Sequence, residues 1–125
     1  MQNQLEGEDM PYAKHRDWFP IYLHDYQVTV SKIIPACLRS EDEWLIDDIY
    51  HVLDLRSRLE EELNKRPKLK RYRRSIKEVD EMLLAQKEML IKILGDGNLQ
   101  RYRDSFSPPL SHWWWYLDSY RSVIH

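Results

Sequence analysis

The chain has 125 residues, of which 42% are hydrophobic and 32% are charged, and its formal net charge is −2. This composition is too apolar for an intrinsically disordered chain, and the length suits one domain with a single hydrophobic core. A net charge this close to zero excludes a uniformly basic protein that is drawn to polyanions, and the single cysteine excludes a disulfide framework within the chain.

The first residues and the hydropathy pattern bear on location. Residues 1–10 are polar and acidic, and they lack the basic flank and the apolar run of a secretory signal. No stretch of the sequence approaches the roughly 18 consecutive apolar residues of a membrane span. We therefore expect a cytoplasmic protein without a membrane span, with a polar N-terminal tail at 1–10 and a single helical domain at 11–125.

The first predicted helix begins near Pro20, because the missing N–H of proline costs nothing at a helix start. The apolar residues after it follow one another at steps of three and four, which is the spacing of one helical face. These residues are Leu23, Tyr26, Val30, Ile33 and Cys37. We expect Pro35 to kink or stop this helix, because proline cannot donate a backbone hydrogen bond.

The second predicted helix spans about residues 41–64. Ser40 and Glu43 form a capping box, in which the side chain of each residue bonds the backbone N–H of the other. An apolar stripe with heptad-like spacing follows and is interrupted by Arg56. The stripe consists of Leu45, Ile49, Val52, Leu59 and Leu63.

The third predicted helix spans residues 67–94 and carries the cleanest stripe in the chain, with only Gln86 polar on the row. The stripe consists of Leu69, Tyr72, Ile76, Val79, Leu83, Leu90 and Ile93. Pro67 suits a helix start, and Gly95 suits a left-handed cap at the end. Because the connector at 64–67 is short, the two long helices must run antiparallel, which predicts an αα-hairpin.

Two shorter helices are expected at the C-terminal end. Asn98 caps the first of them, which carries Leu99, Tyr102 and Phe106 and ends at Pro108–Pro109. Ser111 caps the last helix, on which one face is shared by Trp113, Leu117, Tyr120 and Ile124. The predicted fold class is therefore all-α: a small helical bundle built on a long antiparallel αα-hairpin, with an N-terminal helix and a Trp-rich C-terminal helix.

Charge is divided unevenly along the chain. Residues 1–64 contain 6 Lys/Arg and 14 Asp/Glu, whereas residues 65–125 contain 13 and 7. The run Lys65–Lys77 holds much of the basic excess, and clustered Lys and Arg favour binding to a phosphate backbone. The candidate polyanion-binding residues, which point away from the apolar stripe, are Lys70, Arg71, Arg74 and Lys77. The alternative is that the hairpin sets this run beside Glu60–Glu62, so that the charges are satisfied within the molecule.

The tryptophan run is the other candidate site. Three successive residues on a helix fan over roughly 200° of its circumference, so one flat contact cannot cover all three indoles. Either the run is wedged into the core on several sides, or at least one indole is exposed and favours a protein partner. The candidate protein interface consists of Trp113, Trp114, Trp115 and Tyr116.

The sequence gives little support for chemistry. The spacing of a bundle metal site occurs at Asp47, Asp48, His51 and Asp54. Helical geometry turns Asp47, His51 and Asp54 away from the apolar stripe, however, and the partner helix offers no inward carboxylate. Cys37 lies on an apolar stripe, where cysteine usually behaves as a small hydrophobe. We therefore expect no enzyme activity, no metal site and no cofactor.

The leading functional prediction is a non-enzymatic protein-interaction or self-associating helical domain. It would bind another protein, or a second copy of itself as a homodimer, through the hairpin stripe and the exposed part of Trp113–Tyr116. The alternative prediction is a nucleic-acid-binding module that uses the basic run Lys65–Lys77.

Overall fold

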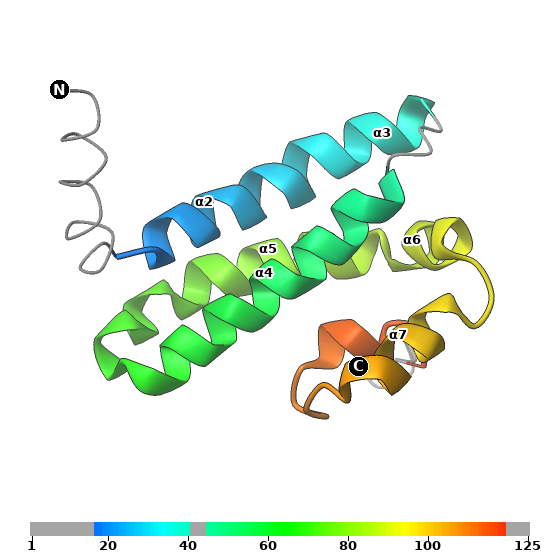
Figure 1. Cartoon of the computed structure of the whole chain (residues 1–125). Helices are drawn as coiled ribbons and strands as arrows, with labels where there is room; N and C mark the ends of the chain where they lie inside the picture. The colour runs from blue at the N-terminus through cyan, green and yellow to red at the C-terminus, as the bar shows by residue number, and fades with distance from the viewer. Residues whose placement is uncertain (1–16, 41–44, 120–125) are drawn as a thin grey trace, which may run out of the picture.

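The computed structural model describes residues 17–40 and 45–119, and all regular structure in this part of the chain is helical (Figure 1). The predicted all-α class is confirmed. The expected tail at 1–10 and most of the capping box at 40–43 lie outside the described residues. Among the described helices, none combines the length and the apolar composition that crossing a bilayer requires.

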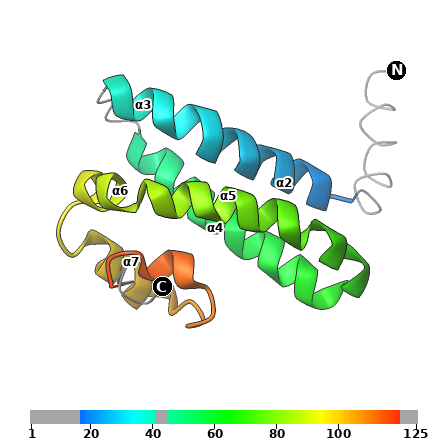
Figure 2. The same cartoon turned by 180° about the vertical axis from the view of Figure 1, so that it is seen from behind.

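An N-terminal arm covers one side of the bundle. It consists of α2 (Phe19–Val28), the π-helical turn η1 (Thr29–Ile33) and α3 (Ile34–Ser40), which follow one another along the same direction (Figures 1 and 2). Pro20 lies in the first turn of α2, as expected from its missing N–H. The arm packs against both long helices of the bundle.

The π turn rotates the buried face of this arm. Tyr26 and Val30 are fully buried, as the predicted stripe requires, but Ile33 is exposed and Ile34 is buried in its place. A π turn contains more residues than an α turn, so the buried position shifts along the chain by one residue. Cys37, farther along the predicted stripe, is only half-buried.

Pro35 does not stop the arm, because the π turn accommodates it. The N–H of Ile34 bonds the carbonyl of Thr29, five residues earlier. In that register the carbonyl of Val30 would accept from the N–H of residue 35, which proline lacks. The side-chain amide of Gln86 donates to the Val30 carbonyl instead, at 3.2 Å. A residue from a distant helix therefore replaces the missing backbone donor.

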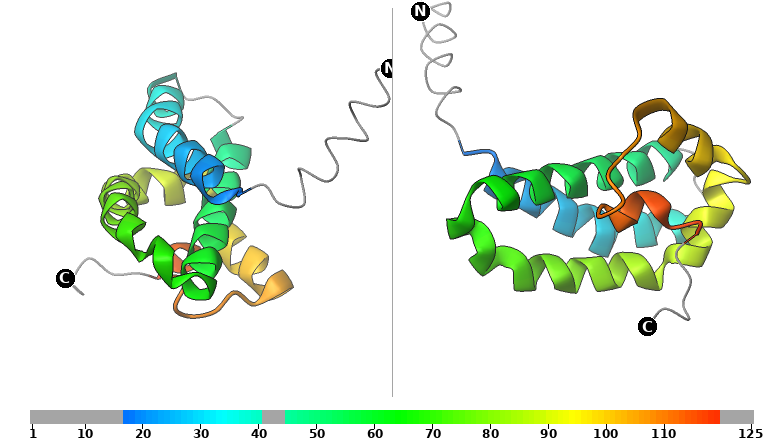
Figure 3. Two further views of the ribbon diagram at one scale, coloured as in Figure 1. Left: turned by 90° about the vertical axis from the view of Figure 1, so that its left-hand side faces the viewer. Right: turned by 90° about the horizontal axis from the view of Figure 1, so that it is seen from below.

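Two long helices form the centre of the molecule. α4 (Leu45–Lys65) and α5 (Arg73–Ala85) run in opposite directions and are joined by the 3₁₀ turn η2 (Pro67–Tyr72) (Figures 1 and 3). The chain thus reverses where the short connector predicts. Most of the predicted stripe residues are buried in one cluster, namely Ile49, Val52, Leu59, Leu63, Leu69, Ile76, Val79 and Leu83.

The third predicted helix, at 67–94, is interrupted twice. It begins with η2, and α5 stops one residue before Gln86, after which α6 (Lys87–Leu94) starts. Gln86 has φ −100° and ψ 5°, outside the helical range. Its Nε2 also donates to the carbonyl of Met82 at 3.1 Å. Since glutamine is a good helix former, the break arises from the contact of Gln86 with Val30 of the N-terminal arm and not from local propensity.

A buried ion pair crosses from α4 to α5. Arg56, which interrupts the apolar stripe, is 5% exposed, and its Nε and Nη2 donate to the Asp80 carboxylate at 2.8 and 3.0 Å. Tyr26 of the N-terminal arm donates its hydroxyl proton to the same carboxylate at 2.5 Å. Burial, together with the nearby Asp80 charge, raises the pKa of this phenol well above its usual value. Three helical segments therefore meet at one carboxylate.

The C-terminal layer, residues 98–119, covers the side of α4 that faces away from the N-terminal arm (Figures 1 and 2). It contains α7 (Asn98–Phe106) and the 3₁₀ turn η3 (Trp113–Tyr116). In the described residues the expected Trp-rich helix is a single short turn, and it begins after His112, whose ψ of 73° lies outside the helical range. Tyr120 and Ile124, assigned to that helix, lie outside the described residues.

Candidate functional site

The tryptophan run lies mainly in the core. Trp114 and Trp115 are 1% and 2% exposed, whereas Trp113 and Tyr116 are half-buried against the same cluster. The run is wedged between α4 and α7, which is the first of the two arrangements that the sequence left open. Of the candidate interface residues, Trp113 and Tyr116 therefore keep part of their surface exposed, whereas the two central indoles are covered within the molecule.

One hydroxyl on α4 holds both buried indoles. The Nε1 atoms of Trp114 and Trp115 donate to Ser57 Oγ at 2.9 and 2.7 Å. The same oxygen lies 3.1 Å from Nδ1 of His112. A hydroxyl has two lone pairs and one proton, so the two indoles leave the proton for His112 Nδ1. His112 is therefore neutral and carries its proton on Nε2, and burial lowers its pKa in agreement with this state.

Arg103 of α7 joins that helix to the segment around η3 within the C-terminal layer. It is 9% exposed, and its Nη1 donates to the carbonyl of Trp115 at 2.9 Å and to Asp118 at 2.5 Å. Its guanidinium carbon also lies 4.9 Å from the ring centroid of Tyr116. The sequence offered no sign of this role, because an arginine on a short amphipathic helix is usually a solvated residue.

An aromatic patch lies on the surface above Trp115 and consists of Tyr50, Tyr102 and Phe106. The ring centroid of Tyr102 is 4.4 Å from that of Tyr50 and 5.1 Å from that of Phe106. The Trp115 ring meets Tyr102 and Phe106 edge-to-face at 5.2 and 4.7 Å. Tyr102 and Phe106 are nevertheless 37% and 44% exposed. Sequence reasoning placed Leu99, Tyr102 and Phe106 on one short helix, and of these three only Leu99 is buried.

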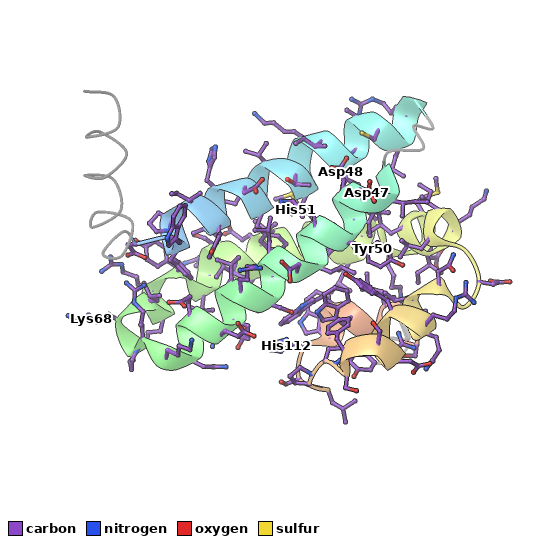
Figure 4. All side chains as sticks on the ribbon, in the orientation of Figure 1. Asp47, Asp48, Tyr50, His51, Lys68 and His112 are labelled. Carbon is purple, nitrogen blue, oxygen red and sulfur yellow. The ribbon has the colours of Figure 1, made fainter. Side chains whose placement is uncertain are left out.

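A depression lies beside Phe106. It is lined by Asp54, Ser57, Glu61, Phe106, Ser107, Pro108, Pro109, His112 and Trp115. Ser107 has a left-handed φ of 48°, and the chain then passes through the two prolines that form one wall. Asp54 and Glu61 are exposed on α4 and make the opposite wall acidic. Tyr50 lies on the side of α4 that faces the C-terminal layer, and His112 lies in that layer (Figure 4).

The basic tip, residues 65–77, lies where α4 turns back into α5, and Lys68 marks this end of the molecule in Figure 4. Two of its arginines make the contacts that internal neutralisation predicts. Arg66 pairs with Glu62 at 3.4 Å, and Arg73 pairs with Glu60 at 3.2 Å. Although burial opposes it, hydrogen bonds from Arg73 and Arg56 lower the pKa of Glu60.

The other cations of the basic tip are not neutralised in this way. All four candidate polyanion-binding residues, Lys70, Arg71, Arg74 and Lys77, are exposed. Within residues 17–40 and 45–119, none of them lies within ion-pair distance of a carboxylate. Arg71 instead covers the ring of Tyr72 at 4.9 Å.

The residues with metal-site spacing do not converge. In the described part of the chain, no three His, Cys, Asp or Glu residues are placed to hold a metal ion together. His51 Nε2 lies 3.0 Å from Asp25 on α2, and Asp54 pairs with Arg58 at 2.9 Å. Asp47–Asp48 lie in the first turn of α4 (Figure 4), where carboxylates offset the positive end of the helix dipole.

Comparisons of this chain with protein-family models, with curated proteins and with solved structures found no match. Two surfaces have features that internal packing does not account for: the aromatic patch with its acidic depression, and the basic tip.

Proposed function

We propose that this chain is a non-enzymatic protein-interaction domain that binds its partner through the aromatic patch and the depression beside it. The observation that carries the proposal is the exposure of Tyr102 and Phe106, 37% and 44%, directly above the buried indole of Trp115. Large aromatic side chains gathered at one exposed place are typical of the centres of protein interfaces.

The patch is ordered before any partner arrives. The indole N–H of Trp115 is bonded to Ser57, and its carbonyl accepts a hydrogen bond from buried Arg103. Tyr102 and Phe106 rest on this fixed ring through edge-to-face contacts. Aromatic side chains that are already immobile lose little conformational entropy on binding, so more of the contact energy contributes to affinity.

The depression indicates the chemistry of the partner. An apolar side chain can occupy the space between Phe106 and the Pro108–Pro109 wall. Glu61 borders that space and favours Lys or Arg beside the apolar side chain, whereas Asp54 is already paired with Arg58; Leu110 in the adjoining loop is 82% exposed. The proposed partner is therefore a protein segment with an apolar anchor next to basic residues.

A second copy of the chain is the other candidate partner and would form a homodimer. The hairpin stripe is no longer proposed as the contact surface, because its residues are covered within the molecule. We also propose a cytoplasmic location, since a chain with a single cysteine suits a reducing compartment.

A pair of matched variants tests the proposal. Phe106→Glu places a charge in the patch, and Met89→Glu places the same charge on an apolar side chain of similar exposure on α6 (44% and 48%). Leu110→Glu is a third variant that perturbs the loop without touching the packing of Trp115. We expect a partner that wild type and Met89→Glu retain in affinity capture, and that Phe106→Glu and Leu110→Glu lose.

The captured partner is then purified and titrated calorimetrically. Loss of a hot-spot residue costs about 2 kcal/mol or more, so Phe106→Glu should weaken binding by at least roughly thirtyfold. Light scattering of the wild-type chain alone distinguishes a homodimer from a complex with another protein. If wild type is monomeric and all variants retain the same proteins, the aromatic patch is not a binding surface.

A further inference from the structure

The basic tip carries more positive charge than the molecule neutralises. Residues 65–77 contain eight Lys or Arg and no Asp or Glu. Arg66 and Arg73 pair with carboxylates of α4 or with Asp17, at 3.0 to 3.4 Å. The remaining six have no ion pair with any carboxylate in the described part of the chain, and they are Lys65, Lys68, Lys70, Arg71, Arg74 and Lys77.

The position of these cations concentrates their field. They lie on the last turn of α4, on η2 and on the first turns of α5, which together form one end of the molecule (Figures 1 and 3). Like charges this close repel one another, and an anion bound at this end would remove that repulsion. The net charge of −2 for the whole chain conceals this local excess.

We propose that the basic tip binds the phosphodiester backbone of a nucleic acid without regard to base sequence. Clustered Lys and Arg release condensed counterions when they replace them along a phosphate backbone, and this gain requires no apolar contact. Arg71 and Arg74 add planar guanidinium groups, which suit phosphate oxygens. This surface is separate from the aromatic patch, so the inference does not depend on the protein-interaction proposal.

The apolar residues of the tip argue against a membrane as the ligand. Leu69 and Ile76 are buried, at 5% and 1% exposure. Tyr72 is half-buried, and its ring packs against Phe19 at 5.2 Å. A peripheral membrane helix needs an apolar face that enters the bilayer, and the tip has no such side chain to offer. Residues 65–77 likewise include no exposed apolar anchor for a folded protein partner.

The exposed cations of the basic tip extend only as far as Lys77, within α5. Arg73, Arg74 and Lys77 line an open depression together with Glu78 and Glu81. The two carboxylates repel phosphate, so contacts should extend from Lys77 toward the turn and not farther along α5. The basic tip therefore reaches only a short length of backbone. We expect weak binding, typical of sequence-independent contacts, with a Kd of about 1 to 100 µM at physiological salt.

The test uses the full chain and fluorescein-labelled 20-nucleotide probes of mixed sequence, both single-stranded and duplex. The variant Lys70→Gln/Arg74→Gln/Lys77→Gln removes three unpaired cations of the tip. The control Lys32→Gln/Arg39→Gln/Lys92→Gln removes the same charge from exposed positions on η1, α3 and α6. Binding is measured by anisotropy between 50 and 200 mM salt, and the circular dichroism of each variant verifies its fold.

We expect wild type and control to bind within about twofold of each other, and the tip variant to bind at least roughly tenfold more weakly. The slope of log K against log salt for the single-stranded probe should be shallower by about 2 in the tip variant, which is the share of three phosphate contacts. The single-stranded and duplex probes then show which form of the backbone the tip prefers.

Four outcomes would overturn the proposal. One is that wild type binds neither probe at 50 mM salt, and another is that both triple variants lose the same affinity, which would reduce the effect to net charge. The third is that wild type sediments with vesicles containing phosphatidylserine but does not bind the probes. The fourth is that polyglutamate of equal charge competes as well as an unlabelled oligonucleotide, which would mean that the tip recognises anionic protein segments.

Discussion

At the scale of single residues, Ser57 is the position on which the C-terminal layer most depends. Its hydroxyl accepts from two buried indoles and donates to His112, so all of its hydrogen-bonding capacity is used. Within residues 17–40 and 45–119, neither indole N–H has another acceptor, and both rings are buried. The hydroxyl therefore fixes the position of the two largest side chains in the core.

We predict that Ser57→Ala lowers the free energy of unfolding by about 2 to 4 kcal/mol. The substitution leaves two buried N–H donors unsatisfied, and each such group costs about 1 to 3 kcal/mol. Ser31→Ala is the matched control, because the Ser31 hydroxyl is exposed and bonds only a backbone carbonyl of its own helical arm. Urea denaturation measures both, and a Ser57→Ala variant as stable as the control would contradict the assigned hydrogen bonds.

His112 makes the stability of this layer depend on pH. Burial lowers its pKa from the usual 6.5, while Glu60 and Glu61 oppose the shift and Arg56 adds to it. Well above pH 6.5 the ring is neutral in both the folded and the unfolded chain, so it contributes no pH dependence there. As the pH falls below that value, the unfolded chain binds a proton first, and the folded state loses stability until its own lower pKa is reached.

The expected result is a free energy of unfolding that falls more steeply from pH 7.5 to pH 5 in wild type than in His112→Asn. Asparagine keeps an acceptor near Ser57 but does not titrate. Every other titratable side chain is common to both proteins, so the difference between the two curves isolates His112. Parallel pH curves would rule out a neutral His112 as the bonded form.

At the scale of elements, the break between α5 and α6 and the π turn of the N-terminal arm are two halves of one contact. Gln86 leaves the helical conformation and gives its amide to the Val30 carbonyl, which Pro35 cannot serve. The π turn leaves the Val30 carbonyl without a backbone donor, and the break at Gln86 places an amide donor beside it. The pair therefore aligns the N-terminal arm with the centre of the bundle.

This dependence predicts energetic coupling between Gln86 and Pro35. Gln86→Leu removes the donor and should destabilise the protein by about 1 to 2 kcal/mol, because the Val30 carbonyl is left without its partner. Pro35→Ala restores a backbone N–H within the arm, so Gln86→Leu should cost less in that background. A double-mutant cycle by urea denaturation is expected to give a coupling energy of about 0.5 kcal/mol or more. Additive losses would show that the two residues act independently.

The sequence predicted the helices better than their interruptions, for a physical reason. Apolar stripes such as Ile76–Leu83 are local patterns with a helical period, and burial follows from them directly. Arg56 instead interrupts an apolar stripe, and the stripe does not reveal its partner Asp80, which lies 24 residues away on another helix. That both residues lie on the inward rows of antiparallel helices was the one available signal of their pairing.

The candidate sites also divide into features that a local sequence pattern reveals and features that only tertiary packing determines. The charge of the basic tip is visible in the sequence, but only the structure separates its paired arginines from Lys70, Arg74 and Lys77. The aromatic patch was missed, because the exposure of Tyr102 and Phe106 depends on how α7 docks over Trp115. Residue spacing placed both rings on one short helix, and tertiary packing decides how much of each ring is covered.

At the scale of the whole molecule, the C-terminal layer and the hairpin are expected to unfold as one unit. Arg56 pairs with Asp80 on one side and lies 4.2 Å from the ring centroid of Trp114 on the other, so it links the layer to both long helices. Detaching the layer would uncover Trp114 and Trp115 and remove the ring that covers a buried charge. A partly open state that keeps α4 and α5 intact is thus too costly to accumulate.

Tryptophan fluorescence and far-ultraviolet circular dichroism should therefore show the same midpoint in urea. Three of the five tryptophans are in residues 113–115, so fluorescence reports mainly on the layer, whereas circular dichroism reports on all the helices. Arg103→Ala, which releases Trp115 and Asp118, should lower both midpoints together by removing about 1 to 3 kcal/mol. If fluorescence changes at a lower urea concentration than circular dichroism, the layer opens on its own, and its aromatic patch would be a mobile surface instead of a rigid one.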